Sequence, residues 1–241
     1  MRKTPGIVLR TADFKDSDRM LTLLTKDFGL MAAKVRSAKK QTSKLFSASS
    51  LFCCGDYEFY EKGGYYGVRG CRIRYTFHHL LGDYDAFSAA CFIADAAGKV
   101  AQEDFAAPKL FALTVCALYA LDTAAVSPGT VLCYFIQRLL WLEGLYPILD
   151  ACVVCGSAKN ISRFSIEHGG AVCGTCAKTH AGVAADKDVF AALSGMACIL
   201  PKDIGVVSLL KDTERKLKSL LVDYLEYNLQ KPLKSSRFIR K

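Results

Sequence analysis

The first third of the chain has short apolar segments separated by polar turns, a spacing that favours β-strands. Met20–Thr25, taken alone, also fits a helix, whereas Gly63 and Gly64 are typical of a hairpin turn. Several short strands in so few residues predict a small barrel or sandwich. The segments with this pattern are Gly6–Arg10, Met20–Thr25, Gly29–Val35, Asp56–Tyr60, Tyr65–Val68 and Cys71–Tyr75.

A polar stretch from residue 37 to residue 50 interrupts these strands. It contains several serines together with Lys39, Lys40 and Lys44, and it is too polar to form a core strand. We therefore expect an exposed loop.

Beyond Gly82 the apolar residues recur at helical spacing. Pro108 suits the first position of a helix, Gly144 suits a helix end, and Pro232 follows the last helix. The predicted helices are Asp85–Val100, Pro108–Ala124, Val131–Glu143, Asp186–Leu193 and Asp212–Leu229. No apolar run approaches the roughly 20 residues of a membrane helix. The N-terminus also lacks the apolar core of a secretory signal, so we expect a cytoplasmic protein with no membrane partner.

A cysteine- and glycine-rich segment interrupts the helical region. The predicted fold class is therefore α+β multidomain, with a β module, then a helical module into which a small metal-binding segment is inserted. The predicted domains are 1–80, 81–149, 150–178 and 179–241, of which the second and fourth form the helical module.

Two C-x-x-C pairs in the inserted segment form the strongest motif in the chain. Their spacing is typical of a structural zinc site in which four thiolates close a tetrahedral coordination shell and leave no position for substrate. Gly156 and Gly174 are expected to permit the tight turns, and residues on either side of His168 and Gly169 fit a hairpin. The predicted ligands of one Zn²⁺ are Cys152, Cys155, Cys173 and Cys176.

Other interpretations of these residues remain open at this point. The two pairs also fit redox-active dithiols, and His168 or His180 would be substitute ligands. Among the remaining cysteines, Cys91, Cys116 and Cys133 lie in apolar helical patterns and are expected in the core. The others, for which the same core role is favoured, are Cys53, Cys54, Cys71 and Cys198.

The positive charge is concentrated in the β module. The net charge of the chain is +9, and residues 1–80 hold 15 Lys and Arg against 7 Asp and Glu. Residues 81–241 hold 17 against 16. This asymmetry favours a polyanionic partner, with nucleic acid first and an anionic membrane second, over a surface that is basic only for solubility.

Cations with aromatic residues between them suit a single strand, because cations follow phosphates while aromatic rings stack on open base faces. The expected phosphate contacts are Lys34, Arg36, Lys39, Lys40, Lys44, Arg72 and Arg74. The accompanying aromatic residues, at least half of which we expect in the core, are Phe46, Tyr57, Phe59, Tyr65 and Tyr66.

Catalytic motifs are missing from the sequence. It contains neither G-x-x-x-x-G-K-[ST] nor G-x-G-x-x-G, and the zinc-deaminase pattern is also absent. Asp13, Asp16 and Asp18 are interpreted as a polar turn. We therefore expect a protein that is not an enzyme.

Several motifs, in order along the chain, resemble the RecO family of bacterial DNA repair proteins. Gly6–Arg10, Asp16-x-Asp18 and Leu23-Leu-Thr25-x-x-x-Gly29 resemble its N-terminal oligonucleotide-binding (OB) barrel, and Lys39-Lys40 with Ser43-Lys44-Leu45 resembles its basic loop. The later motifs resemble its zinc knuckle and closing helix: Leu149-Asp150-x-Cys152-x-x-Cys155-Gly156, Gly169-Gly170-x-x-Cys173-x-x-Cys176 and Tyr224–Leu229 with Lys231–Phe238.

The resemblance implies a recombination mediator with an N-terminal OB-fold. Such proteins bind single-stranded DNA and the acidic C-terminal tail of the single-strand-binding protein, and they anneal complementary strands. With RecR, and often RecF, they help RecA replace the single-strand-binding protein at the nucleoid. The alternatives are an RNA-binding or ribosome-associated zinc protein, since a basic barrel also suits RNA, and a redox-switched chaperone.

Overall fold

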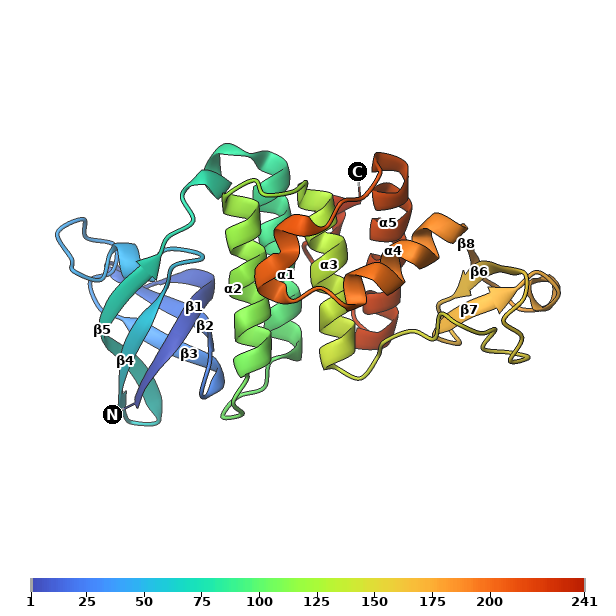
Figure 1. The fold of residues 1–241 in the computed structure, drawn as a ribbon. Helices are drawn as coiled ribbons and strands as arrows, with labels where there is room; N and C mark the ends of the chain where they lie inside the picture. Colours follow the sequence, from blue (N-terminus) through green and yellow to red (C-terminus); the bar gives the residue numbers. More distant parts are fainter. Residues whose placement is uncertain (1, 241) are drawn as a thin grey trace. The chain divides into compact units, whose positions relative to one another are not determined.

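The chain divides after Asp122 into two compact units, which are described separately (Figure 1). The structure, a computed structural model, describes residues 2–240. Within that part of the chain, no helix has the length and apolar character needed to span a membrane. The sequence-based domain boundaries differ from this division and remain a prediction.

The first unit begins with a closed barrel of five strands, β1 (Arg2–Phe14), β2 (Asp18–Thr25), β3 (Gly29–Val35), β4 (Cys54–Lys62) and β5 (Tyr65–Tyr75). Neighbouring strands follow the order β1-β2-β3-β5-β4, and β4 pairs with β1 to close the barrel. Only β3 and β5 pair in parallel. This order is the topology of an OB barrel, so the predicted fold class is confirmed.

Two segments predicted as separate strands form one continuous strand, β5. The register against β4 passes from Phe59↔Val68 to Glu58↔Gly70, so that Arg69 has no opposite residue. A β-bulge of this kind accommodates an extra residue and bends the strand without ending it. A second shift leaves Arg74 without an opposite residue close to the end of β5.

Alternating residues of the strands fill the barrel, where Val8, Leu23, Met31, Tyr57 and Phe59 are buried together. Two helices complete the unit, α1 (Tyr84–Val100) and α2 (Pro108–Asp122), after the short 3-10 helix η2 (His79–Gly82). The positive φ of Gly29 lets the β2–β3 turn approach the α1–α2 connection, where Leu30 N–H donates to the Gln102 carbonyl at 3.0 Å. The helices also pack against β1 and β2 of the barrel.

The polar loop between β3 and β4 is exposed at its middle but anchored at its end. Lys39, Lys40 and Lys44 are exposed, as predicted, whereas Ala48 and Ser49 in the 3-10 helix η1 (Ser47–Ser49) are buried. The buried Tyr57 hydroxyl donates to the Ala48 carbonyl at 2.7 Å. The barrel core therefore fixes the position at which the loop returns.

The second unit contains α3 (Pro128–Leu142), α4 (Lys187–Ala197), η4 (Pro201–Val206), α5 (Lys211–Leu229) and the short α6 (Ser236–Ile239). Helix α3 packs on α4 and α5 and buries Phe135, Ile136 and Leu139. Between α3 and α4 lies a small sheet of β6 (Ile161–Ser165), β7 (Gly170–Cys173) and β8 (Val183–Ala184), with β6 in the middle. The 3-10 helix η3 (Cys176–Lys178) follows β7.

Helix α3 begins three residues earlier than predicted, because Ser127 provides an N-cap that Glu214 of α5 contacts. The Ser127 side chain accepts a hydrogen bond from Thr130 N–H at 3.2 Å. The Thr130 hydroxyl donates to the Glu214 carboxylate of α5 at 2.7 Å, and the Ser127 hydroxyl also contacts that carboxylate. A negative charge beside the first N–H groups of a helix is stabilising.

Replacing Gly129 by alanine should destabilise the protein by about 1 kcal/mol, because the new Cβ would push the Glu214 side chain out of its contacts with Ser127 and Thr130. Gly195→Ala is the matched control, since Gly195 lies inside α4 with open space around a Cβ. That control should be neutral or stabilising by up to about 1 kcal/mol. Urea unfolding measures both, and equal effects of the two substitutions would contradict the prediction.

Candidate functional site

The first C-x-x-C pair occupies a turn between α3 and β6. Gly156 adopts a positive φ of 74°, and its N–H donates to the Cys152 carbonyl at 2.8 Å. The Cys152 N–H donates to the Ser157 carbonyl at 2.9 Å and closes the turn. The expected role of Gly156 is therefore confirmed, because few other residues adopt this conformation without strain.

The second pair follows a β-hairpin, as predicted. Strands β6 and β7 pair antiparallel, with Gly169 at a φ of 69° in the turn. Cys173 ends β7, and Cys176 begins η3. Gly174 differs from the expectation, since it has no positive φ; a side chain there would come within 2.8 Å of the Asn160 amide nitrogen.

The two turns bring the four predicted ligand atoms together. The Sγ atoms of Cys152, Cys155, Cys173 and Cys176 lie within 4.8 Å of one another, and those of Cys155 and Cys173 are 3.8 Å apart. A tetrahedral ion with Zn–S bonds of about 2.3 Å requires sulfur atoms about 3.8 Å apart. All four cysteines are free, and their sulfur positions suit a metal ion rather than a disulfide.

The backbone around the cluster favours thiolates at two of the four sulfurs. Hydrogen bonds from backbone groups, that of Cys173 foremost, lower the pKa of Cys152 to about 6. The backbone of Cys176 likewise lowers the pKa of Cys173 below its ordinary value. Because metals bind the thiolate rather than the thiol, this arrangement prepares the cluster for a cation.

The imidazole rings of the two nearby histidines contact each other, and the His180 backbone N–H donates to the Cys176 carbonyl at 2.9 Å. The rings of His168 and His180 meet edge to face with centroids 5.2 Å apart. His168 Nδ1 lies 3.1 Å from the Ser165 hydroxyl. Within residues 2–240, the group that could hold a metal ion consists of the four cysteines alone.

The cysteine-rich segment packs against α5. Phe164 of β6 is buried, and its ring meets the ring of Tyr224 edge to face at 5.3 Å. The Tyr224 hydroxyl donates to the Leu145 carbonyl at 3.1 Å. The segment that carries the four cysteines therefore packs against a helix of its own unit.

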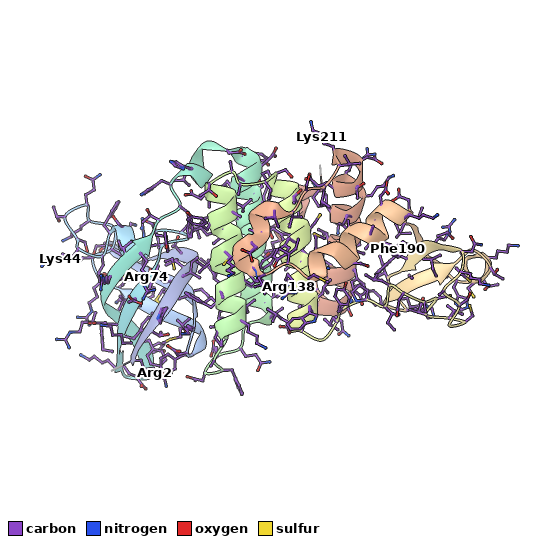
Figure 2. The ribbon with its side chains drawn as sticks, viewed as in Figure 1. Arg2, Lys44, Arg74, Arg138, Phe190 and Lys211 are labelled. Atoms are coloured by element: carbon purple, nitrogen blue, oxygen red, sulfur yellow. The ribbon has the colours of Figure 1, made fainter. Side chains whose placement is uncertain are left out.

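Four of the seven predicted phosphate contacts are exposed and carry no ion pair with any residue from 2 to 240. They are Arg36, Lys40, Lys44 and Arg72. Figure 2 labels Lys44 on the loop and Arg74 on the barrel. The side chains that remain available to a polyanion therefore lie on the loop and near the end of β5.

The other three cations are paired with carboxylates of the same barrel. Lys34 lies 2.8 Å from Asp18, Lys39 lies 2.9 Å from Asp13, and Arg74 makes two contacts with Asp56 at 2.9 and 3.0 Å. The Lys39 ammonium holds the pKa of Asp13 below its usual value, and Lys34 does the same for Asp18. Asp13 and Asp18 therefore stay ionised near neutral pH and weaken the field of their partners.

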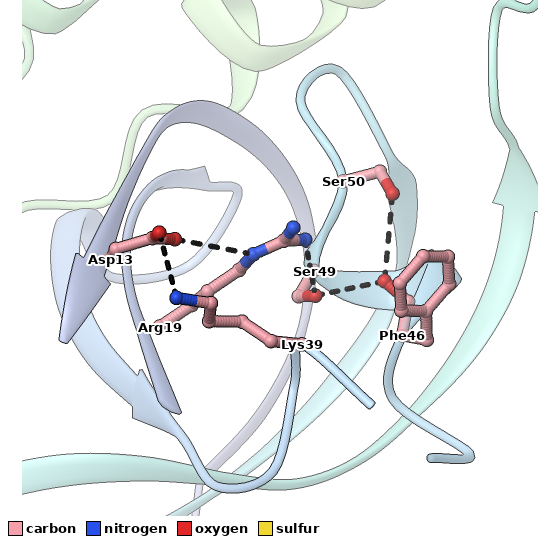
Figure 3. Close-up of polar contacts among 6 residues, drawn as sticks. All are labelled: Asp13, Arg19, Lys39, Phe46, Ser49 and Ser50. Atoms are coloured by element: carbon pink, nitrogen blue, oxygen red, sulfur yellow. Dashed lines mark hydrogen bonds and ion pairs between the residues drawn. The ribbon is translucent and has the colours of Figure 1, made fainter. Parts of the chain in front are cut away.

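Asp13 also belongs to a polar network that holds the loop, shown in Figure 3. Its carboxylate lies 3.9 Å from Arg19 Nε, and Arg19 donates to the Ser49 hydroxyl at 3.3 Å. Ser49 in turn donates to the Phe46 carbonyl at 2.8 Å. The sequence did not indicate this role of Arg19, because the contacts join residues from distant parts of the chain.

The aromatic residues divide between core and surface. Tyr57 and Phe59 are fully buried, Phe46 and Tyr66 are partly buried, and Tyr65 is 76% exposed. Sequence reasoning missed Phe14, which is 38% exposed at the end of β1. The Lys34 Nζ atom lies 4.9 Å from the Phe14 ring centroid, a cation–π distance.

Cys53, Cys54 and Cys71, which are apart from other potential metal ligands in the sequence, lie close together in the barrel. Burial raises the pKa of Cys54 to about 12, and that of Cys71 to about 12, with a smaller contribution from neighbouring Cys53. Cys133 is buried as expected, whereas Cys91 and Cys116 are only partly buried and Cys198, which was also expected in the core, is exposed. None of them belongs to the group within residues 2–240 that could hold a metal ion, and the buried ones serve packing.

The fold and the site define a class of protein in which a basic OB barrel precedes a helical region with a four-cysteine insert. The family description "Recombination protein O N terminal" matches residues 1–77, and "Recombination protein O C terminal" matches residues 81–237. The chain belongs to the RecO family, and it has a DNA repair role.

Relatives along most of the chain carry the name "DNA repair protein RecO". That of Caldanaerobacter subterraneus is 31% identical over 177 residues, which cover 73% of this chain and 72% of the relative. That of Halalkalibacterium halodurans is 26% identical over 98% of this chain and 93% of the relative. That of Listeria welshimeri is 25% identical over 100% of this chain and 94% of the relative.

Replacing Cys152 by serine should abolish stoichiometric metal binding, because three thiolates and a hydroxyl hold the ion far less tightly. We expect about one equivalent of metal per wild-type chain and less than half an equivalent in the variant, with a lower melting temperature. Cys198→Ser is the control, since Cys198 is exposed and outside the cluster. Elemental analysis after expression in reducing, metal-replete medium decides, and a metal-free wild type would refute the site.

Proposed function

We propose that this chain binds single-stranded DNA through its basic barrel, anneals complementary strands and helps load RecA onto DNA coated by single-strand-binding protein. The observation that carries the proposal is the set of exposed cations on the loop and on β5 of an OB barrel, Arg36, Lys40, Lys44 and Arg72. Membership of the RecO family supports the same role.

Annealing requires no covalent chemistry. Two strands repel each other through their phosphates, and cations that follow the backbone neutralise this repulsion while the base edges stay free to pair. A protein with this activity needs a positive surface but no nucleophile or general base. The chain is therefore proposed to act as a mediator rather than as an enzyme.

The proposed ion in the cysteine cluster is Zn²⁺, because four thiolates at these separations suit its tetrahedral preference. With all four positions filled by protein, the ion has a structural role. Cys152, Cys155, Cys173 and Cys176 would hold it, and its binding would stabilise the turns and the Phe164–Tyr224 contact.

The proposed partners follow from the family. They are the acidic C-terminal tail of the single-strand-binding protein, RecR, and in addition RecF and RecA, all of which act on DNA at the nucleoid. A basic chain is electrostatically suited to an acidic tail.

Annealing of two complementary oligonucleotides coated with single-strand-binding protein tests the proposed function. We expect the full-length, metal-loaded protein to accelerate annealing in the absence of ATP. A matched RNA pair provides the comparison. No acceleration with DNA, together with tighter binding of RNA, would replace the proposal with an RNA-binding function.

The double substitution Lys40→Ala and Lys44→Ala should weaken binding of single-stranded DNA and make its salt dependence shallower. Each phosphate contact on a single strand contributes about 0.7 to the slope of log K against log salt, so the slope should fall by about 1.4. Adding Lys39→Ala should lower this slope by less than either of the other two substitutions, because Lys39 is already paired with Asp13. Binding is measured by fluorescence anisotropy at several salt concentrations.

The control removes two exposed lysines of the second unit, Lys187→Ala with Lys202→Ala. It changes the net charge by the same amount, and we expect a smaller change in slope. Equal slopes for both double variants would show that the loop makes no special contact with DNA.

A further inference from the structure

Two tyrosines form an exposed aromatic surface beside the end of β5. Tyr75, the last residue of β5, is 49% exposed, and Tyr119 of α2 is 51% exposed. Their ring centroids are 6.0 Å apart with an interplanar angle of 72°. The two residues are 44 positions apart in sequence but adjacent within the first unit, and we name them the tyrosine pair.

One ring of the tyrosine pair, that of Tyr75, is supported by a buried aromatic ring. The Tyr75 ring stacks on Phe77, with centroids 6.0 Å apart and planes inclined by only 20°. Phe77 itself is buried in the unit. A tyrosine ring has few rotatable bonds, and one that already rests on a fixed ring loses little freedom when another ring stacks on it.

Basic side chains flank the tyrosine pair. Arg72 is exposed, and Arg74 precedes Tyr75 at a β-bulge, where the register steps from Gly55↔Ile73 to Cys54↔Tyr75. Such a bulge redirects the side chains around it. The Asp56 carboxylate holds the Arg74 guanidinium through two contacts at 2.9 and 3.0 Å, so that its position is fixed.

The basic loop returns to the barrel at the same place. It leads into β4 at Cys54, whose register partner is Tyr75. The end of β5 that carries the tyrosine pair is therefore also the end reached by the loop with Lys40 and Lys44. Tyr65 lies at the opposite end of β5, where it pairs with Lys62.

We infer that the tyrosine pair is a base-stacking site for a single strand, at which Tyr75 and Tyr119 hold unpaired bases while Arg72 contacts the adjacent phosphates. We infer a single strand as the ligand because exposed, supported rings lie beside cations. An unpaired strand offers both open base faces for the rings and phosphates for the cations. A duplex hides its base faces inside the stack. The inference rests on the proposed function and supplies the reason why single strands would be preferred over duplexes.

Binding of a thymidine oligonucleotide and of an abasic oligonucleotide of equal length tests the inference. Both strands carry the same phosphates, but only the first carries bases. We expect the full-length wild type to bind the thymidine strand about tenfold or more tightly, given the usual contribution of stacking on aromatic side chains. This comparison needs no variant, so no loss of folding can affect it.

Variants then locate the site. Tyr75→Ala and Tyr119→Ala should each weaken binding of the thymidine strand by about fivefold or more and leave the abasic strand unchanged. Tyr75→Phe should retain wild-type binding, since it keeps the ring. Phe105→Ala is the control, because Phe105 is 66% exposed in the same unit but follows the acidic Glu103 and Asp104.

The possible failures are distinguishable. A wild type that binds neither strand refutes the proposed function together with the inference. Equal binding of the two strands overturns base stacking and leaves DNA binding through phosphates intact. A base preference that survives in both Tyr75→Ala and Tyr119→Ala overturns the tyrosine pair as its location.

Discussion

Four sulfur atoms gathered within 4.8 Å of one another suit a cation at their centre, because four thiolates held this close would repel one another without it. The backbone hydrogen bonds that lower the pKa values of Cys152 and Cys173 increase the demand for a cation. A bound ion would fix both turns and the hairpin between them. Phe164 carries this order to Tyr224 and thus to α5, whose Glu214 caps α3. The helices of the second unit are thereby linked to the cluster through packing and hydrogen bonds.

In the first unit the distribution of carboxylates decides how the positive charge is used. Asp13 pairs with Lys39 and Arg19, Asp18 with Lys34, and Asp56 with Arg74. These pairs fix the loop, the end of β3 and the bulge of β5. Cations without a carboxylate partner exert a positive field that no neighbouring negative charge weakens, and this field is available to a ligand. The barrel therefore divides its basic residues between those that shape the surface and those that remain available on it.

The sequence predicted those parts of the structure that depend on local patterns. Strand periodicity, the cysteine spacing and Gly156 led to the barrel, the cluster and the first turn. It could not predict the bulges at Arg69 and Arg74, because these depend on the register against β4. It also missed the ion pairs of Lys34, Lys39 and Arg74, the network of Arg19 and the pairing of Tyr75 with Tyr119. All of these join residues that only the closed fold brings together.

The hydrogen bond from Tyr57 to Ala48 has a consequence for conformational entropy as well as for stability. It tethers the returning end of the loop to the barrel core, whereas the other end continues from β3. A loop held at both ends samples fewer conformations than a free tail of the same length. If the proposed DNA binding orders Lys40 and Lys44, the entropy lost on binding would be smaller than for a free tail, and the affinity correspondingly higher.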